Sequence, residues 1–184
     1  MKNSSAKLLQ LGRRQRGRIL RHFLALSESD RILRFGNAIN DTAIAHYVDQ
    51  IDMQQDVLFG LALPHGQLLA VAHLAVRHPV QIDAPQYAAP ARAELGLSVL
   101  ARARGKGYGS RLFELVIDHC RGAEIASLYM HCLSSNQTML HIAKKAGMAI
   151  VRDHGEADAY LQFPSTSMST MERPQAPQQA IFAD

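Results

Sequence analysis

Residues 93–110 read AELGLSVLARARGKGYGS, and this stretch decides the fold. Its first half is apolar enough for a buried strand, and helical spacing of apolar residues begins at Tyr108. The bend between them carries alternating glycines at 105, 107 and 109, which leave backbone N–H groups open to a bulky anion. Because the helix N-terminus adds unpaired donors and partial positive charge, the bend predicts a pyrophosphate-binding site.

The rest of the chain alternates predicted helices with predicted strands. Helical patterns cover residues 18–26, 41–51, 108–120 and 136–146, and strand patterns cover 56–63, 68–76, 93–100, 125–133, 149–152 and 157–163. This order predicts an α/β domain whose strand–helix–strand centre is a parallel crossover. We expect a mobile basic segment over 1–17, the folded domain over 18–163 and a disordered tail over 164–184. A proline-containing loop is expected over 79–90.

Composition restricts the class of protein. Hydrophobic residues make up 47% of the 184 residues, and no apolar run is long enough to span a membrane. The basic N-terminus is not typical of a secretory signal, so we expect a cytoplasmic protein without membrane association. Cys120 and Cys132 lack metal-site spacing, and we expect both to be buried and inert.

Positive charge gathers near the start of the chain. The net charge is +4, and arginines occupy positions 13, 14, 16, 18 and 21. Such a run can bind nucleic acid, but few aromatic residues accompany it and no nucleic-acid motif is present. A solvated helix start is the preferred interpretation, and nucleic-acid binding is kept as an alternative.

The glycine spacing excludes two common phosphate-binding motifs. The Rossmann fingerprint needs Gly-x-Gly-x-x-Gly, whereas Gly105, Gly107 and Gly109 are evenly spaced. The Gly-Lys-Ser/Thr end of a P-loop is also absent. A plain strand-to-helix turn remains the alternative for this bend taken by itself.

The pattern Arg104-x-x-Gly107-x-Gly109 after an apolar strand resembles the pyrophosphate motif of the GCN5-related N-acetyltransferases (GNAT). Asn136 opening a helix that Gly147 closes is similar to a second element of that superfamily. Within it, the strand and this helix resemble bacterial protein-lysine acetyltransferase domains, as does the segment 31–35. The resemblance implies a mixed, mostly antiparallel sheet with a central splayed parallel strand pair and flanking helices.

The same resemblance implies acetyl-CoA as cosubstrate and no metal. The backbone of Leu97 and Val99 would pair with the pantetheine arm, and an N–H near Leu97 or Ser98 would polarise the thioester carbonyl. The Asn136 side chain would hold the cofactor arm, although a plain helix cap is the alternative and the two roles can coexist. The bend would hold the pyrophosphate through Arg104, Gly105, Lys106, Gly107, Tyr108, Gly109 and Ser110.

Glu94 is the candidate general base, because it is the acidic residue on an otherwise apolar strand. By strand alternation it shares a face with Gly96 and Ser98. The resembling protein acetyltransferases carry their base at the matching glutamate. The alternative is a strand-end glutamate that only faces solvent.

The general acid is left unassigned. Many family members carry a tyrosine where this chain has Ala143. Tyr108, Tyr129 and His141 are substitutes by type, without the right register. His73, in an apolar strand, could line the substrate cleft, but a core or surface histidine is the preferred interpretation.

We therefore expect an N-acetyltransferase that moves an acetyl group from acetyl-CoA to a protein lysine or a small-molecule amine, with a homodimer possible. The alternative is a GNAT fold that binds acetyl-CoA as a regulatory module without efficient transfer.

Overall fold

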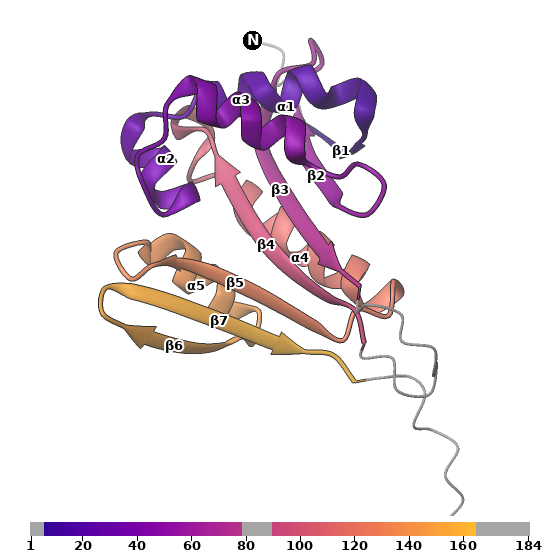
Figure 1. The fold of residues 1–184 in the computed structure, drawn as a ribbon, viewed down its shortest axis with the longest axis vertical. Helices are drawn as coiled ribbons and strands as arrows, with labels where there is room; N and C mark the ends of the chain where they lie inside the picture. Colours follow the sequence, from indigo (N-terminus) through magenta and orange to yellow (C-terminus); the bar gives the residue numbers. More distant parts are fainter. Residues whose placement is uncertain (1–5, 79–89, 165–184) are drawn as a thin grey trace, which may run out of the picture.

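The computed structural model describes residues 6–78 and 90–164. Its strands form one sheet in the order β1-β2-β3-β4-β5-β7-β6 (Figure 1). The strands are β1 (Lys7–Leu11), β2 (Val57–Ala62), β3 (Leu68–Arg77), β4 (Arg92–Val99), β5 (Ser127–Leu133), β6 (Ala149–Asp153) and β7 (Glu156–Gln162). The helices are α1 (Arg16–Leu24), α2 (Glu28–Phe35), α3 (Asp41–Gln50), α4 (Tyr108–Gly122) and α5 (Gln137–Lys145), with short 3-10 turns η1 (Arg13–Gln15) and η3 (Ala101–Ala103).

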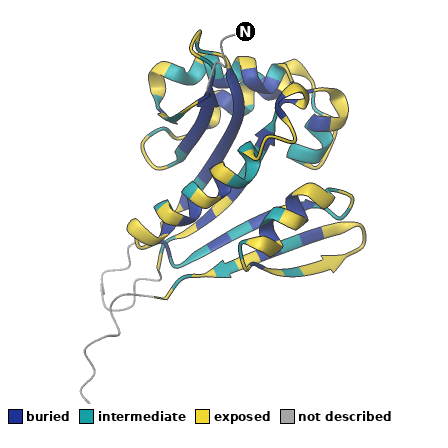
Figure 2. Ribbon diagram, turned by 180° about the vertical axis from the view of Figure 1, so that it is seen from behind, coloured by how far each residue is buried: buried dark blue, intermediate teal, exposed yellow. Residues whose placement is uncertain are grey.

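Two hydrophobic cores lie on opposite faces of the sheet. Val71 of β3 packs with buried residues of α1 and α3, whereas its neighbour Ala72 belongs to the core that α4 and α5 cover. Side chains alternate between the two faces of a strand, so β3 serves both cores and is buried along most of its length. Figure 2 shows the same central strands as the continuously buried part of the molecule.

The strands β4 and β5 form the parallel pair of an otherwise antiparallel sheet. Their pairing covers only Arg92 to Glu94 of β4 and ends at the partners Glu94 and Tyr129. On its other side β4 stays paired with β3 as far as Val99. The two strands therefore diverge into a wedge (Figure 1), and the predicted mixed sheet with a splayed parallel pair is confirmed.

Two elements differ from the sequence expectation. The strand β1 pairs with β2 along its whole length, inside the segment 1–17 that was expected to be mobile. The helix α2 lies outside the predicted helical patterns, and it begins at Glu28 because the Ser27 side chain accepts a hydrogen bond from the Asp30 N–H. It ends at Gly36 with φ +81°, the left-handed conformation that favours glycine.

The remaining expectations have mixed outcomes. Cys120 and Cys132 are buried, and burial raises the pKa of Cys120 to about 11, which suits an inert thiol. The Arg16 guanidinium donates to the Val48 and Ile51 carbonyls, so this basic residue caps α3 from within the fold. Most of the loop 79–90 and of the tail 164–184 lies outside the described residues. The domain boundaries at 18 and 163 stay a prediction.

Candidate active site

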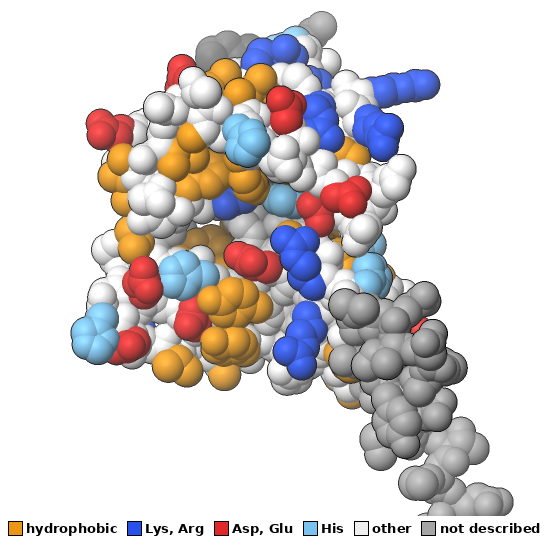
Figure 3. Space-filling view, viewed as in Figure 1, with side chains coloured by type: hydrophobic (Ala, Val, Ile, Leu, Met, Phe, Trp, Pro, Cys, Tyr) orange, Lys and Arg blue, Asp and Glu red, His pale blue; other side chains and the backbone are white. Residues whose placement is uncertain are grey.

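Two connected hollows fill the wedge between β4 and β5. The first, called the glycine groove, has a volume of about 680 Å³ and is lined by the free edge of β4, the bend before α4 and the start of α5. The second, called the Glu94 cavity, has a volume of about 280 Å³ and lies between β4, β5, α2 and α3. Both are lined by Arg34 and Leu97, so they meet at the middle of β4. Figure 3 shows the hollow between the upper and lower parts of the molecule.

The bend before α4 uses its three glycines in two ways. Gly105 and Gly107 both have φ +73° and open space where a Cβ would stand, so conformation requires glycine there. A Cβ on Gly109 would instead lie 3.2 Å from Ile142 and within 4 Å of Leu97 and Val99, so Gly109 permits close packing of α4. Gly107 caps α4 without a side chain, which leaves the N–H groups of the first turn available to a ligand.

The two basic residues of the bend are placed differently. Arg104 lines the groove, and its guanidinium is bound to the Asp30 carboxylate of α2 and to the Val99 carbonyl at 3.3 Å. Lys106 is not among the lining residues. Of the other predicted bend residues, Gly105, Gly107, Tyr108, Gly109 and Ser110 line the groove.

The free edge of β4 presents backbone groups to the groove. The Leu100 N–H donates to the Leu69 carbonyl on the β3 side. Backbone groups alternate in direction along a strand, so those of Val99 and Leu97 face away from β3 and toward the wedge. The bond from Arg104 to the Val99 carbonyl agrees with that direction. The predicted backbone positions therefore lie on an unpaired edge.

Asn136 lines the groove opposite this edge. Its Oδ1 accepts a hydrogen bond from the Met139 N–H at 3.2 Å, so it caps α5. The cap leaves its amide donors unused by that bond, and the cofactor role remains a prediction.

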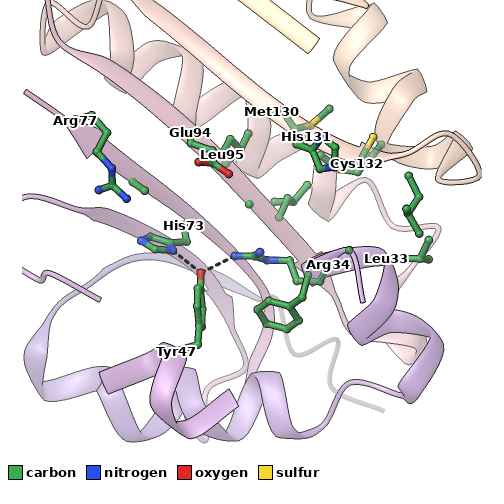
Figure 4. A pocket seen from close by; sticks show the side chains of 17 residues that line it. Leu33, Arg34, Tyr47, His73, Arg77, Glu94, Leu95, Met130, His131 and Cys132 are labelled. Carbon is green, nitrogen blue, oxygen red and sulfur yellow. Dashed lines mark hydrogen bonds between the residues drawn. The ribbon is translucent and has the colours of Figure 1, made fainter. Parts of the chain in front are cut away.

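Glu94 lies at the point where β4 and β5 part and lines the cavity named after it (Figure 4). Its side chain is exposed, as the solvent-facing alternative expects, yet it also borders the cavity. Ser98, two positions beyond Gly96 on the same face, is buried and bound to His22 at 2.8 Å. Burial lowers the pKa of His22 to about 4, so this histidine is neutral.

A largely buried polar network lines the side of the Glu94 cavity opposite Glu94. The Tyr47 hydroxyl lies 2.6 Å from His73 Nδ1, and His73 Nε2 lies 3.0 Å from Asp56 Oδ2. The Arg34 guanidinium donates to the Tyr47 oxygen at 2.7 Å (Figure 4). His73 thus lines the Glu94 cavity and is also hydrogen-bonded in the core, and a role of this cavity as the substrate cleft stays a prediction. Tyr47 lies within the helical pattern predicted over 41–51, and no sequence spacing signals the network.

The substitutes for a general acid have unequal positions. Tyr108 and His141 line the glycine groove. Tyr129 lines neither hollow, and its hydroxyl donates to Asp158 at 2.7 Å. Burial and the Asp158 carboxylate raise the pKa of Tyr129, which makes it a poor proton donor.

Comparison with known families decides the identity. The model of the acetyltransferase (GNAT) family matches residues 25–148, which is more than half of the chain. The chain belongs to this family. It is thus an acyltransferase of the acetyl-CoA-dependent N-acetyltransferase type. The groove fits acetyl-CoA, because it joins free N–H donors for a pyrophosphate to an unpaired strand edge for an amide-containing arm.

Solved structures agree on the fold of this GNAT enzyme. The GNAT domain of PAT from S. lividans superposes with a TM-score of 0.66 at 18% identity, over 86% of this chain and 90% of that one. NAA60 from Arabidopsis thaliana in complex with acetyl-CoA gives 0.61 at 12% identity, over 86% and 98%. An N-acetyltransferase from Staphylococcus aureus Mu50 gives 0.61 at 16% identity, over 86% and 99%. Comparison with curated protein sequences gives no match.

Two features are absent from the described ranges, 6–78 and 90–164. No helix there combines the length and the apolar character that crossing a bilayer requires. No group of three metal-ligating side chains occurs there either.

Proposed function

We propose that this GNAT enzyme acetylates a primary amine, of a protein lysine or of a small molecule, with Glu94 as the general base. The observation that carries the proposal is that one strand edge joins the two hollows. The bend and the free edge of β4 line the groove, and the same edge reaches the cavity that Glu94 borders. A thioester lying along β4 would bring its carbonyl close to an amine held in the cavity.

Each group has a chemical task in this proposal. The N–H groups at the start of α4 hold the pyrophosphate, and those of Leu97 and Val99 bind the cofactor arm and polarise the carbonyl. The acceptor arrives as an ammonium ion, which must lose a proton before its nitrogen can attack. Glu94 takes this proton and, being exposed, releases it to water.

The test is a thiol-release assay with acetyl-CoA against polyamines, amino acids, antibiotics and lysine peptides. We expect Glu94→Gln to lower turnover with the accepted amine by about 100-fold or more, while calorimetry finds acetyl-CoA affinity nearly unchanged. The matched control is Glu156→Gln, which alters an exposed glutamate of β7 that lines neither hollow. Equal turnover in wild type and Glu94→Gln would remove Glu94 from the mechanism.

The second candidate is a module that binds acetyl-CoA without efficient transfer, favoured by Ala143 at the position of the usual tyrosine. Tight acetyl-CoA binding without thiol release for any amine would support it. We also propose that the protein is cytoplasmic and bacterial, and a sedimentation measurement tests whether it forms a homodimer.

A further inference from the structure

The network of Asp56, His73, Tyr47 and Arg34 has a defined direction of hydrogen bonding. Arg34 has donors only, so the Tyr47 oxygen accepts from it, and the hydrogen of Tyr47 is directed to His73 Nδ1. The Asp56 carboxylate is an acceptor, so His73 Nε2 carries a hydrogen and donates it. Asp56 is itself held by the Val76 N–H at 3.2 Å. The order is therefore hydroxyl to imidazole to carboxylate.

The inner part of this network is buried, while its outer end reaches the cavity. The side chains of His73 and Asp56 are 9% and 7% exposed. Tyr47 is half-buried and lines the Glu94 cavity together with Arg34. A proton that enters at the Tyr47 oxygen thus has one protein-lined route, through His73 toward Asp56.

The charged surroundings of His73 come from several elements. They are Arg34 of α2, Asp56 ahead of β2, Arg77 of β3, Glu94 of β4 and His131 of β5. Burial lowers the pKa of His73, Arg34 and Arg77 lower it further, and Asp56 opposes them. The ring is therefore neutral at pH 7, with Nδ1 able to accept a proton.

We propose that Tyr47, His73 and Asp56 form a proton relay that carries one proton from the acceptor nitrogen to the leaving thiolate. This inference rests on the proposed acetyl transfer. Tyr47 is the catalytic residue, and His73 and Asp56 are positioning residues that act through it. The relay supplies the general acid that the sequence left unassigned.

The proton balance of the step is complete. Glu94 has already passed the first ammonium proton to water, and the free amine attacks the thioester carbonyl and forms a C–N bond. The nitrogen then carries an extra proton, which moves to the Tyr47 oxygen as the hydrogen of Tyr47 shifts to His73 Nδ1. The C–S bond breaks with its electron pair on sulfur. Tyr47 protonates that thiolate and regains its hydrogen from His73. The products are an amide, the thiol of coenzyme A and one proton in solution.

Arg34 has a part in this sequence. Its guanidinium lies 5.5 Å from the centre of the Tyr47 ring and donates to the Tyr47 oxygen. Its positive charge stabilises the negative charge that develops on that oxygen as Tyr47 protonates the thiolate, before His73 returns its hydrogen. The guanidinium packs directly against Gly96, because a Cβ at that position would overlap it.

The first test replaces the hydroxyl and keeps the ring. We expect Tyr47→Phe to lower kcat by about 100-fold, with acetyl-CoA affinity and the midpoint of thermal unfolding close to wild type. Tyr160→Phe is the matched control, because Tyr160 is an exposed tyrosine of β7 that lines neither hollow. Full activity of Tyr47→Phe in an active wild-type background would overturn the relay and leave the acetyltransferase proposal standing. Absence of turnover in wild type with every amine would instead overturn the proposed function.

The second test separates catalysis from structural support. In wild type, kcat falls as the pH drops through the pKa of His73, because a protonated ring cannot accept the hydrogen of Tyr47. Asp56 raises that pKa, so Asp56→Asn should shift this acidic limb to lower pH as well as lower the maximal rate. A purely structural role would lower the rate at all pH values and leave the limb in place. This result decides the question even where Tyr47→Phe proves unstable.

Discussion

Within the described part of the chain, two clusters of aspartate, histidine and tyrosine are arranged in opposite ways. In the relay, His73 stands between Tyr47 and Asp56, and its side chain and that of Asp56 are nearly buried. In the second cluster, which we call the outer cluster, Asp158 stands between Tyr129 and His131, each donating to the same Oδ1. Asp158 and His131 are 38% and 35% exposed.

Comparison of the two clusters indicates which arrangement can move a proton. A histidine in the middle can accept on one nitrogen and donate from the other, whereas a carboxylate in the middle only accepts. Hydrogen bonds from His131 and Tyr129 lower the pKa of Asp158, while burial and Asp158 raise the pKa of Tyr129. The outer cluster therefore keeps each proton on its present atom, although it contains the same residue types.

The largest expected contrast between the clusters is in stability. Asp56→Ala leaves two buried donors, His73 Nε2–H and the Val76 N–H, without an acceptor. We expect it to lower the free energy of unfolding by about 2–4 kcal/mol. Asp158→Ala, in the less buried outer cluster, should lower the free energy of unfolding by less than about 1 kcal/mol. Urea unfolding of both variants at pH 7 measures the difference, and equal losses would contradict the assigned burial.

The two clusters should also differ in the pH range over which they change the free energy of unfolding. The pKa of folded His73 lies below its unfolded value of 6.5, and that of His22 is about 4. Below pH 6.5 the unfolded chain thus binds more protons than the folded chain. As the pH falls, each histidine lowers the free energy of unfolding by up to about 1.4 kcal/mol per pH unit until its folded pKa is reached. The folded pKa of Asp158 is also depressed, so its contribution is present above its unfolded value of 3.8 and lost below it.

Urea unfolding from pH 7.5 to 3 tests this separation. His73→Gln should flatten the slope below pH 6.5, whereas Asp158→Asn should change the profile only below about pH 4. A slope between pH 6.5 and 4 that does not respond to His73→Gln would refute the lowered pKa of His73.

The smallest expected effect comes from a substitution of Gly96, against which the Arg34 guanidinium packs. The methyl group of Gly96→Ala would displace Arg34 from Tyr47 at little cost, because the overlapping atoms end a flexible side chain. We expect a severalfold loss of kcat with unchanged acetyl-CoA affinity.

Gly105→Ala is the opposite case, since it strains the bend at φ +73° and should weaken acetyl-CoA binding. Steady-state kinetics and calorimetry of both variants distinguish the two hollows.

The fold could be predicted from the sequence wherever an element has its own local pattern of apolar spacing or turn residues. The helix at 108–120, the strands around the hairpin and the parallel centre follow from periodicity and turn residues. The helix α2 could not be predicted from periodicity because the polar residues Ser27 to Asp30 interrupt the helical spacing, although a serine before two acidic residues is also a helix start. The strand β1 was missed because its five residues sit beside a dense run of charge.

The candidate site was readable only in part. The glycine bend and Glu94 lie within one continuous stretch, so their placement in adjoining hollows could be predicted. The relay could not be, because Tyr47, Asp56 and His73 come from a helix, a loop and a strand that only tertiary packing brings together. Spacing along the chain carries no information on such a contact.

The early end of the β4–β5 ladder gives the molecule an edge strand inside its own sheet. An exposed edge ordinarily invites pairing with another polypeptide and thereby aggregation. Here the unpaired groups of Leu97 and Val99 lie in a groove that Leu33 and Arg34 of α2 border, together with Met139 and Ile142 of α5. Side chains of two helices therefore cover this edge, which is one way in which proteins keep an exposed strand from pairing with another chain.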